Sequence, residues 1–141
     1  MSEIKVDTLT GKTTANDITV TVGATATMSL EQGLAKCWSR FAPDTNTELD
    51  SLNQSSRSDD GTGLCTVNFT NSFNNTNHAG VNNCAAGGVP TTGDGANISV
   101  VFGQTTALTK LAYGYSGSGS GTTWYLFDYN NQKVVIHGDL A

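Results

Sequence analysis

The chain has 141 residues, enough for one domain of ordinary size, and only 13% of them are charged, about half of the usual ~25%. A net charge of −5 and only seven Lys and Arg residues, none of them clustered, argue against a nucleic-acid surface. No apolar run approaches the ~20 residues that span a bilayer, and the start MSEIKVDTLTGK lacks the basic and apolar regions of a secretory signal. We therefore expect a protein made in a cytoplasm, with no nucleic-acid partner and no membrane insertion.

Thr, Gly, Asn and Ser supply 62 of the 141 residues, whereas Leu, Ile, Val and Phe supply only 29. Uncharged polar groups keep such a chain soluble, and β-branched Thr suits pleated sheets. The net charge is too small for a disordered chain, so we expect a folded protein with a lean core. A lean core in a small chain favours contacts between subunits as a further source of buried area.

Residues 1–28 are predicted to form an N-terminal arm. Two short stretches, at residues 4–6 and 18–22, alternate apolar and polar side chains around the turn-rich spacer LTGKTTAND. Each stretch amounts to half of a thin strand pair and is too small to bury anything alone, so we expect the arm to pair with another chain. The residues predicted to dock on another protein or join subunits are Ile4, Val6, Leu9, Ile18, Val20 and Val22.

Residues 29–141 are predicted to form an antiparallel β-sandwich. Ser29 and Gln32 resemble a capping box for one helical turn that ends at Gly33. A longer helix through Trp38 and Phe41 is the alternative. Residues 35–41 then resemble a strand.

The first predicted hairpin joins residues 48–56 to residues 64–73 through a turn at 58–63. An Asp-Gly pair between alternating strands indicates a hairpin, with Cys65, Val67 and Phe69 on its inner face.

Further short strands follow with no credible long helix, the pattern of a sandwich. Loops are expected at 89–97 and at 116–121, where the sequence is SGSGSG. The strands are expected at 78–87, 98–103 and 107–115, and a second hairpin is expected to join 124–129 to 132–140 through Asn130-Asn131.

The sequence contains no pattern typical of a catalytic, metal or cofactor site. His78 and His137 are 59 positions apart, without a nucleophile elbow or a close Cys/His cluster. The acidic turns at 59–61 and 93–95 lack the alternating donors of a calcium loop. The three cysteines are interpreted as reduced structural thiols. We therefore expect a non-enzymatic protein.

The aromatic residues leave a second function open, because exposed rings can stack on sugars. Filling of the core or of a subunit interface is the plainer interpretation for most of them. Tyr113 and Tyr115, beside the 116–121 loop, are the residues predicted to contact a sugar-bearing receptor.

Three stretches resemble small virion structural proteins of marine and cyanobacterial tailed phages. They are SEIKVDTLTGKTTANDITV with SLEQGLAKCW, the hairpin DDGTGLCTVNFTNSF, and the ending VIHGDLA. The family pattern has an "IKV(D/N)" start, a "(L)QQGLAKAW" segment and a "DNGTGDYTVNFT" hairpin. Cys37, Cys65 and residues 74–106 depart from it.

This resemblance implies a tail-fibre, fibre-tip or head-appendage protein, usually a homotrimer, that is assembled in the bacterial cytoplasm into the virion. The N-terminal segment would dock on other phage structural proteins, and the β-domain would display loops to the host surface.

Overall fold

The computed structural model describes residues 4–10, 18–22, 25–85, 97–116 and 124–141. The chain divides into two compact units, Met1–Leu34 and Ala35–Ala141. In the first unit, β1 (Thr19–Val22) pairs antiparallel with β2 (Ala26–Ser29), and α1 (Leu30–Gly33) follows directly.

The predicted helical turn is confirmed, and the longer helix is wrong, because a strand begins at Cys37. Residues 4–10 form no strand, so the alternating stretch at 4–6 is not part of a strand pair. The partner of β1 is β2, the next segment of the chain, and a hairpin closes the shortest loop. Pairing of the arm with another chain stays a prediction.

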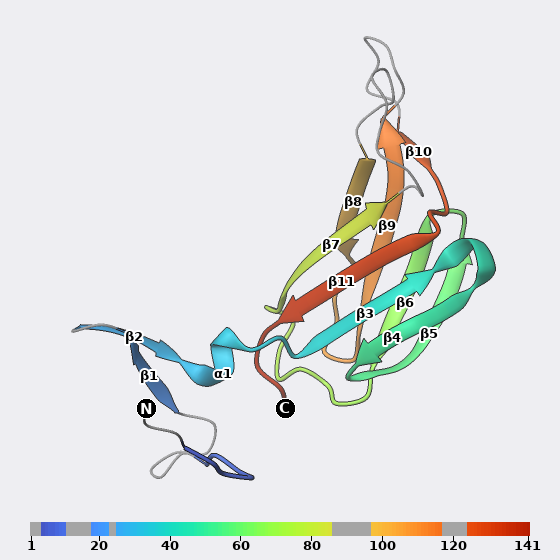
Figure 1. Cartoon of the computed structure of the whole chain (residues 1–141). Coiled ribbons are helices and arrows are strands. Elements are labelled where there is room, and N and C mark those ends of the chain that lie inside the picture. Colours follow the sequence, from blue (N-terminus) through green and yellow to red (C-terminus); the bar gives the residue numbers. More distant parts are fainter. Residues whose placement is uncertain (1–3, 11–17, 23–24, 86–96, 117–123) are drawn as a thin grey trace. The chain divides into compact units, whose positions relative to one another are not determined.

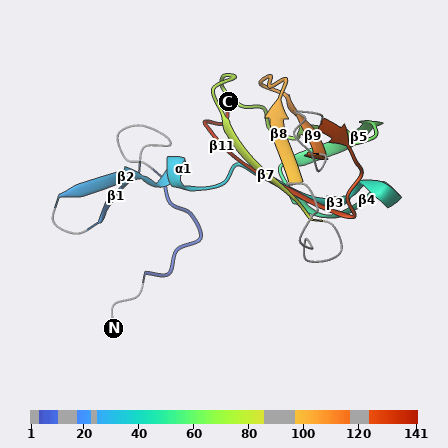
Figure 2. The same ribbon diagram turned by 90° about the horizontal axis from the view of Figure 1, so that it is seen from above.

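The second unit is an antiparallel β-sandwich, which confirms the predicted fold class. In the described part of the chain, one sheet has the order β4–β3–β11–β7 (Figure 1, and from above in Figure 2). The other has five strands: β5, β6 and β9 are neighbours in that order, and β8 and β10 both pair with β9. The strands are β3 (Cys37–Ala42), β4 (Thr47–Leu52), β5 (Gln54–Gly61), β6 (Leu64–Phe69), β7 (Ala79–Ala85), β8 (Asn97–Phe102), β9 (Leu108–Ser116), β10 (Trp124–Leu126) and β11 (Asn131–His137), with a 3-10 turn, η1 (Pro43–Thr45), after β3.

For the first predicted hairpin, the inward-facing residues are correct, but the strand bounds and the position of the turn are wrong. Asn53, with a φ of 56°, ends β4, and β5 then continues through the predicted turn to Gly61. The Asn53 side chain holds this break, because its Oδ1 accepts from the Asn71 N–H at 2.7 Å and its Nδ2 donates to the Asn71 carbonyl at 3.1 Å. The break moves the chain from one sheet to the other.

The second predicted hairpin is wrong. β10 pairs with β9, and β11 lies in the opposite sheet between β3 and β7. The buried Val134 and Ile136 of the seven-residue β11 fit a central strand, whereas β10, with three exposed residues, is too short to support such a position.

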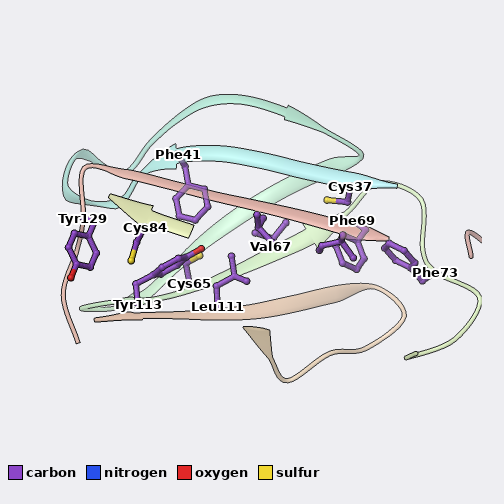
Figure 3. Close-up of a cluster of buried hydrophobic side chains, with 12 residues drawn as sticks. Cys37, Phe41, Cys65, Val67, Phe69, Phe73, Cys84, Leu111, Tyr113 and Tyr129 are labelled. Carbon is purple, nitrogen blue, oxygen red and sulfur yellow. The ribbon is translucent and has the colours of Figure 1, made fainter. Parts of the chain in front are cut away.

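The core lies between the sheets (Figure 3). Cys65, Val67 and Phe69 point into it as predicted, and the Phe41 ring meets the Tyr113 ring edge-on at 6.2 Å. Burial raises the pKa of the Cys37 and Cys65 thiols to about 12, so both stay protonated as small apolar groups. The buried apolar cluster consists of Cys37, Phe41, Cys65, Val67, Phe69, Phe73, Cys84, Leu111, Tyr113, Tyr129, Val134 and Ile136.

His78 is buried at one end of this core. Its ring stacks on Phe73 at 4.5 Å and meets Phe69 edge-on at 5.7 Å. Burial lowers the pKa of His78 below its ordinary 6.5, although the backbone of Asn75 partly opposes this effect. The folded chain therefore holds a neutral imidazole at neutral pH.

We expect the stability of the protein to fall as the pH drops below the ordinary His pKa of 6.5. In that range His78 binds a proton in the unfolded chain but stays neutral in the folded chain. The free energy of unfolding therefore falls by up to about 1.4 kcal/mol per pH unit. Urea denaturation from about pH 7.5 to about pH 5.5 measures this slope. The variant His78→Phe keeps the ring contacts and should lose this part of the slope, so equal slopes in the two proteins would refute the assignment.

Candidate functional site

The sheet that contains β9 continues past the end of the opposite sheet (Figure 1). The paired residues of β9 and β10 in this continuation include aromatic side chains. Tyr115 of β9 lies directly opposite Tyr125 of β10. Because Tyr113 points into the core, the strand alternation places Tyr115 and Tyr125 on the same, core-side face. The rings therefore extend the inner surface of the sandwich beyond its own core.

Tyr115, Tyr125 and Phe127 form an exposed aromatic cluster. The Tyr115 and Tyr125 rings stack with centroids 5.3 Å apart, and Phe127 meets Tyr115 edge-on at 6.1 Å. Their side chains are 37%, 47% and 48% exposed, respectively. Phe127 also contacts the buried Tyr129 at 5.1 Å, which joins the cluster to the core. A solvent-facing set of neighbouring rings is what a stacking ligand requires.

Two glycines allow β10 to approach β9 this closely. A Cβ atom at Gly114 would lie 2.2 Å from the Tyr125 carbonyl oxygen, and one at Gly63 would lie 2.4 Å from the Tyr113 carbonyl oxygen. The freed space is used for hydrogen bonds: the Tyr113 N–H donates to Gly63 at 2.8 Å, and the Phe127 N–H donates to Tyr113 at 3.1 Å. The backbone thus fixes the positions of the rings.

Polar groups tie the same end of the sandwich together. Asp128 Oδ1 accepts from the Gly63 N–H at 2.6 Å, and the Tyr129 hydroxyl donates to the Gly114 carbonyl at 3.0 Å. On the opposite face of β10, Trp124 and Leu126 border a shallow depression above Gly114. The two faces of β10 therefore carry different apolar surfaces.

One of the two predicted receptor residues is wrong. Tyr113 is 1% exposed and belongs to the core, so its ring is not available to a ligand. Tyr115 lies at the surface in the exposed aromatic cluster. The loops expected at 89–97 and 116–121 lie outside the described residues, apart from Asn97 and Ser116.

The predicted docking residues all belong to the first unit. Ile4, Val6 and Leu9 are exposed, while Ile18 and Val20 are half-buried beside or in β1. Val22 ends β1, and its side chain lies outside the described set.

Phe127 was not predicted as a member of the site, and Tyr125 was assigned to the core or an interface. Sequence alternation places both rings on one face of a strand, but only the pairing of β10 with β9 brings them to Tyr115. The alternation of residues along the sequence does not predict this strand pairing, so the cluster could not be found from the sequence.

Among the described residues, no group of three or more His, Cys, Asp and Glu side chains is arranged to hold a metal ion. No described helix is long and apolar enough to cross a membrane. No protein-family model, curated protein or solved structure matches the chain.

Proposed function

We propose that the chain is a non-enzymatic structural subunit of a tailed-phage virion that assembles as a homotrimer. The observation that carries the proposal is the surface of the first unit. Among its residues whose side chains are described, none is buried. Ile4, Val6 and Leu9 are 85%, 55% and 60% exposed, respectively.

A unit of this kind is incomplete by itself. A two-stranded hairpin is marginally stable in water, and β1 and β2 pair only with each other among the described strands. Burying a large aliphatic side chain stabilises a contact by roughly 1.5–3 kcal/mol. We therefore expect the exposed apolar side chains of this short unit to be buried against a second protein. That protein is either another copy of the chain or a neighbouring virion protein.

The resemblance of the first unit, the β5–β6 hairpin and the C-terminal residues to phage virion proteins supports the choice of a virion. In this proposal the first unit docks, and the sandwich displays its loops to the host surface. Identical weak contacts on one particle then act at a high effective concentration.

The test is mass spectrometry of particles purified from a lysate of the phage that encodes the chain. We expect its peptides in the particles, and we expect the double variant Ile4→Asp/Val6→Asp to be missing from them. Leu49→Asp, which changes an exposed leucine of the sandwich, is the matched control and should be incorporated. Absence of the wild-type chain from purified particles would overturn the proposal.

The exposed aromatic cluster favours a second candidate, a carbohydrate-recognition module for a bacterial surface glycan. Tyr115, Tyr125 and Phe127 offer neighbouring rings on one face, as sugar stacking requires. Asp128, the acidic group next to Phe127 in the chain, is engaged with the Gly63 N–H. This arrangement suits a neutral sugar ring rather than a strongly charged ligand.

Loss of one stacking ring should weaken sugar binding about 2- to 10-fold. We expect this for Tyr125→Ala in calorimetric titration with purified polysaccharides from the surface of the host bacterium. Trp124→Ala removes an exposed ring from the opposite face of β10 and should bind like the wild type. Binding that both variants lose equally would place the sugar elsewhere.

A further inference from the structure

The outer face of the β4–β3–β11–β7 sheet carries a row of apolar side chains that the core does not use. Leu52 pairs with Trp38, Trp38 with Val135, and Val135 with Val81. These four residues, which we call the apolar row, thus lie side by side across β4, β3, β11 and β7. Figure 1 shows these four strands next to one another in that order. Leu52 is 48%, Val135 38% and Val81 73% exposed, and Trp38 is half-buried.

A full row of polar residues borders the apolar row on one side. Two residues further along the strands, Asp50, Arg40, Lys133 and Asn83 form the next row, and all four are exposed. On the other side, His137 pairs with Ala79. An apolar centre with a polar rim is the usual composition of an interface between proteins.

We infer that the apolar row is a contact surface for a second copy of this chain, an inference that rests on the proposed oligomeric function. In a trimer whose three-fold axis passes in front of this face, the rows of the three copies come together at the axis. Apolar side chains then meet apolar side chains, with no other partner needed. Trp38, near the middle of the row, is of the residue type that most often dominates such contacts.

The outer face of this sheet is too small to hold two copies together by itself, so the first unit of each copy must supply further contact area. Four strands at ~4.8 Å and three rows at ~6.8 Å cover about 400 Å², roughly half of the ~800 Å² that each partner of a stable complex buries. The exposed apolar side chains of Met1–Leu34 are the remaining surface of the same chain. In this inference, the apolar row and the first unit both contribute contacts between the copies.

The test is sedimentation of the full chain over a range of concentrations, with a charge of either sign placed in the row. Val81→Asp and Val81→Lys change a side chain that is largely outside the fold, so each monomer should keep its thermal midpoint. We expect both to raise the dissociation constant of the assembly at least about tenfold. Phe102→Asp, on the outer face of the other sheet and 41% exposed, is the control and should assemble like the wild type.

The outcomes separate this inference from the proposed function. If both Val81 variants assemble like the wild type while removal of residues 1–34 dissociates the protein, the row is not an interface and the oligomeric function stands. If the wild type is a monomer throughout, both the row contact and the homotrimer are overturned.

Discussion

We expect the substitution Phe41→Ala to lower the free energy of unfolding by about 3–5 kcal/mol. Phe41 is fully buried, its ring meets Tyr113 edge-on, and the Arg57 guanidinium carbon lies 4.8 Å above it. The truncation leaves a cavity in the contact between the two sheets, which a lean core cannot refill. The total free energy of unfolding of a small domain is about 5–15 kcal/mol, so this variant should be close to unfolded.

Chemical denaturation monitored by circular dichroism measures this loss. Phe102→Ala removes the same side chain from the sheet surface, where it is 41% exposed, and should cost about 1 kcal/mol or less. Equal losses for the two variants would contradict the assignment of Phe41 to the core.

We expect Gly63→Ala to cost about 3 kcal/mol or more, through strain at a left-handed residue and loss of the hydrogen bonds around it. Gly63 has a φ of 67°, and a Cβ atom there would lie 2.4 Å from the Tyr113 carbonyl oxygen and 2.7 Å from the Phe127 nitrogen. The methyl group must push β10 away from β9. The exposed aromatic cluster should therefore lose its arrangement together with stability.

Gly61→Ala is the matched control, because Gly61 also has a positive φ, 123°, but a Cβ atom there meets nothing within 4 Å. Both substitutions strain a positive-φ backbone, and only Gly63→Ala adds a collision with neighbouring backbone atoms. Hydrogen exchange should show faster exchange of the Tyr113 and Phe127 amides in Gly63→Ala only. Unchanged exchange of the Tyr113 and Phe127 amides in Gly63→Ala would contradict the described packing of β10.

Local alternation was enough to predict most strands of the sandwich. Cys65, Val67 and Phe69 alternate cleanly after a glycine turn, so both the strand and its buried face followed from the sequence. The break at Asn53 did not, because a single left-handed residue leaves the polar pattern of 48–56 unchanged.

The site depended on tertiary structure that sequence alternation cannot supply. Tyr113 and Tyr115 point to the same side of β9, so the sequence alone does not tell which ring is buried and which is exposed. What separates them is where the opposite sheet ends: Tyr113 is still covered, and Tyr115 is not. The choice of β9 rather than β11 as the partner of β10 likewise depends on which strand edge is free.

The apolar row also depends on strand pairing, since its members come from four separate strands. Leu52 and Val81 are isolated apolar residues in polar stretches of the sequence. Only the register across β4, β3, β11 and β7 assembles them into one surface.

The proposed trimer is tested by the molar mass in solution, measured by light scattering, of the full chain and of residues 35–141. We predict a mass three times the 14.7 kDa of one chain for the full protein, and a shift toward the monomer when the first unit is removed. A full chain that stays at 14.7 kDa at every concentration would contradict the assembly on which the proposed function depends.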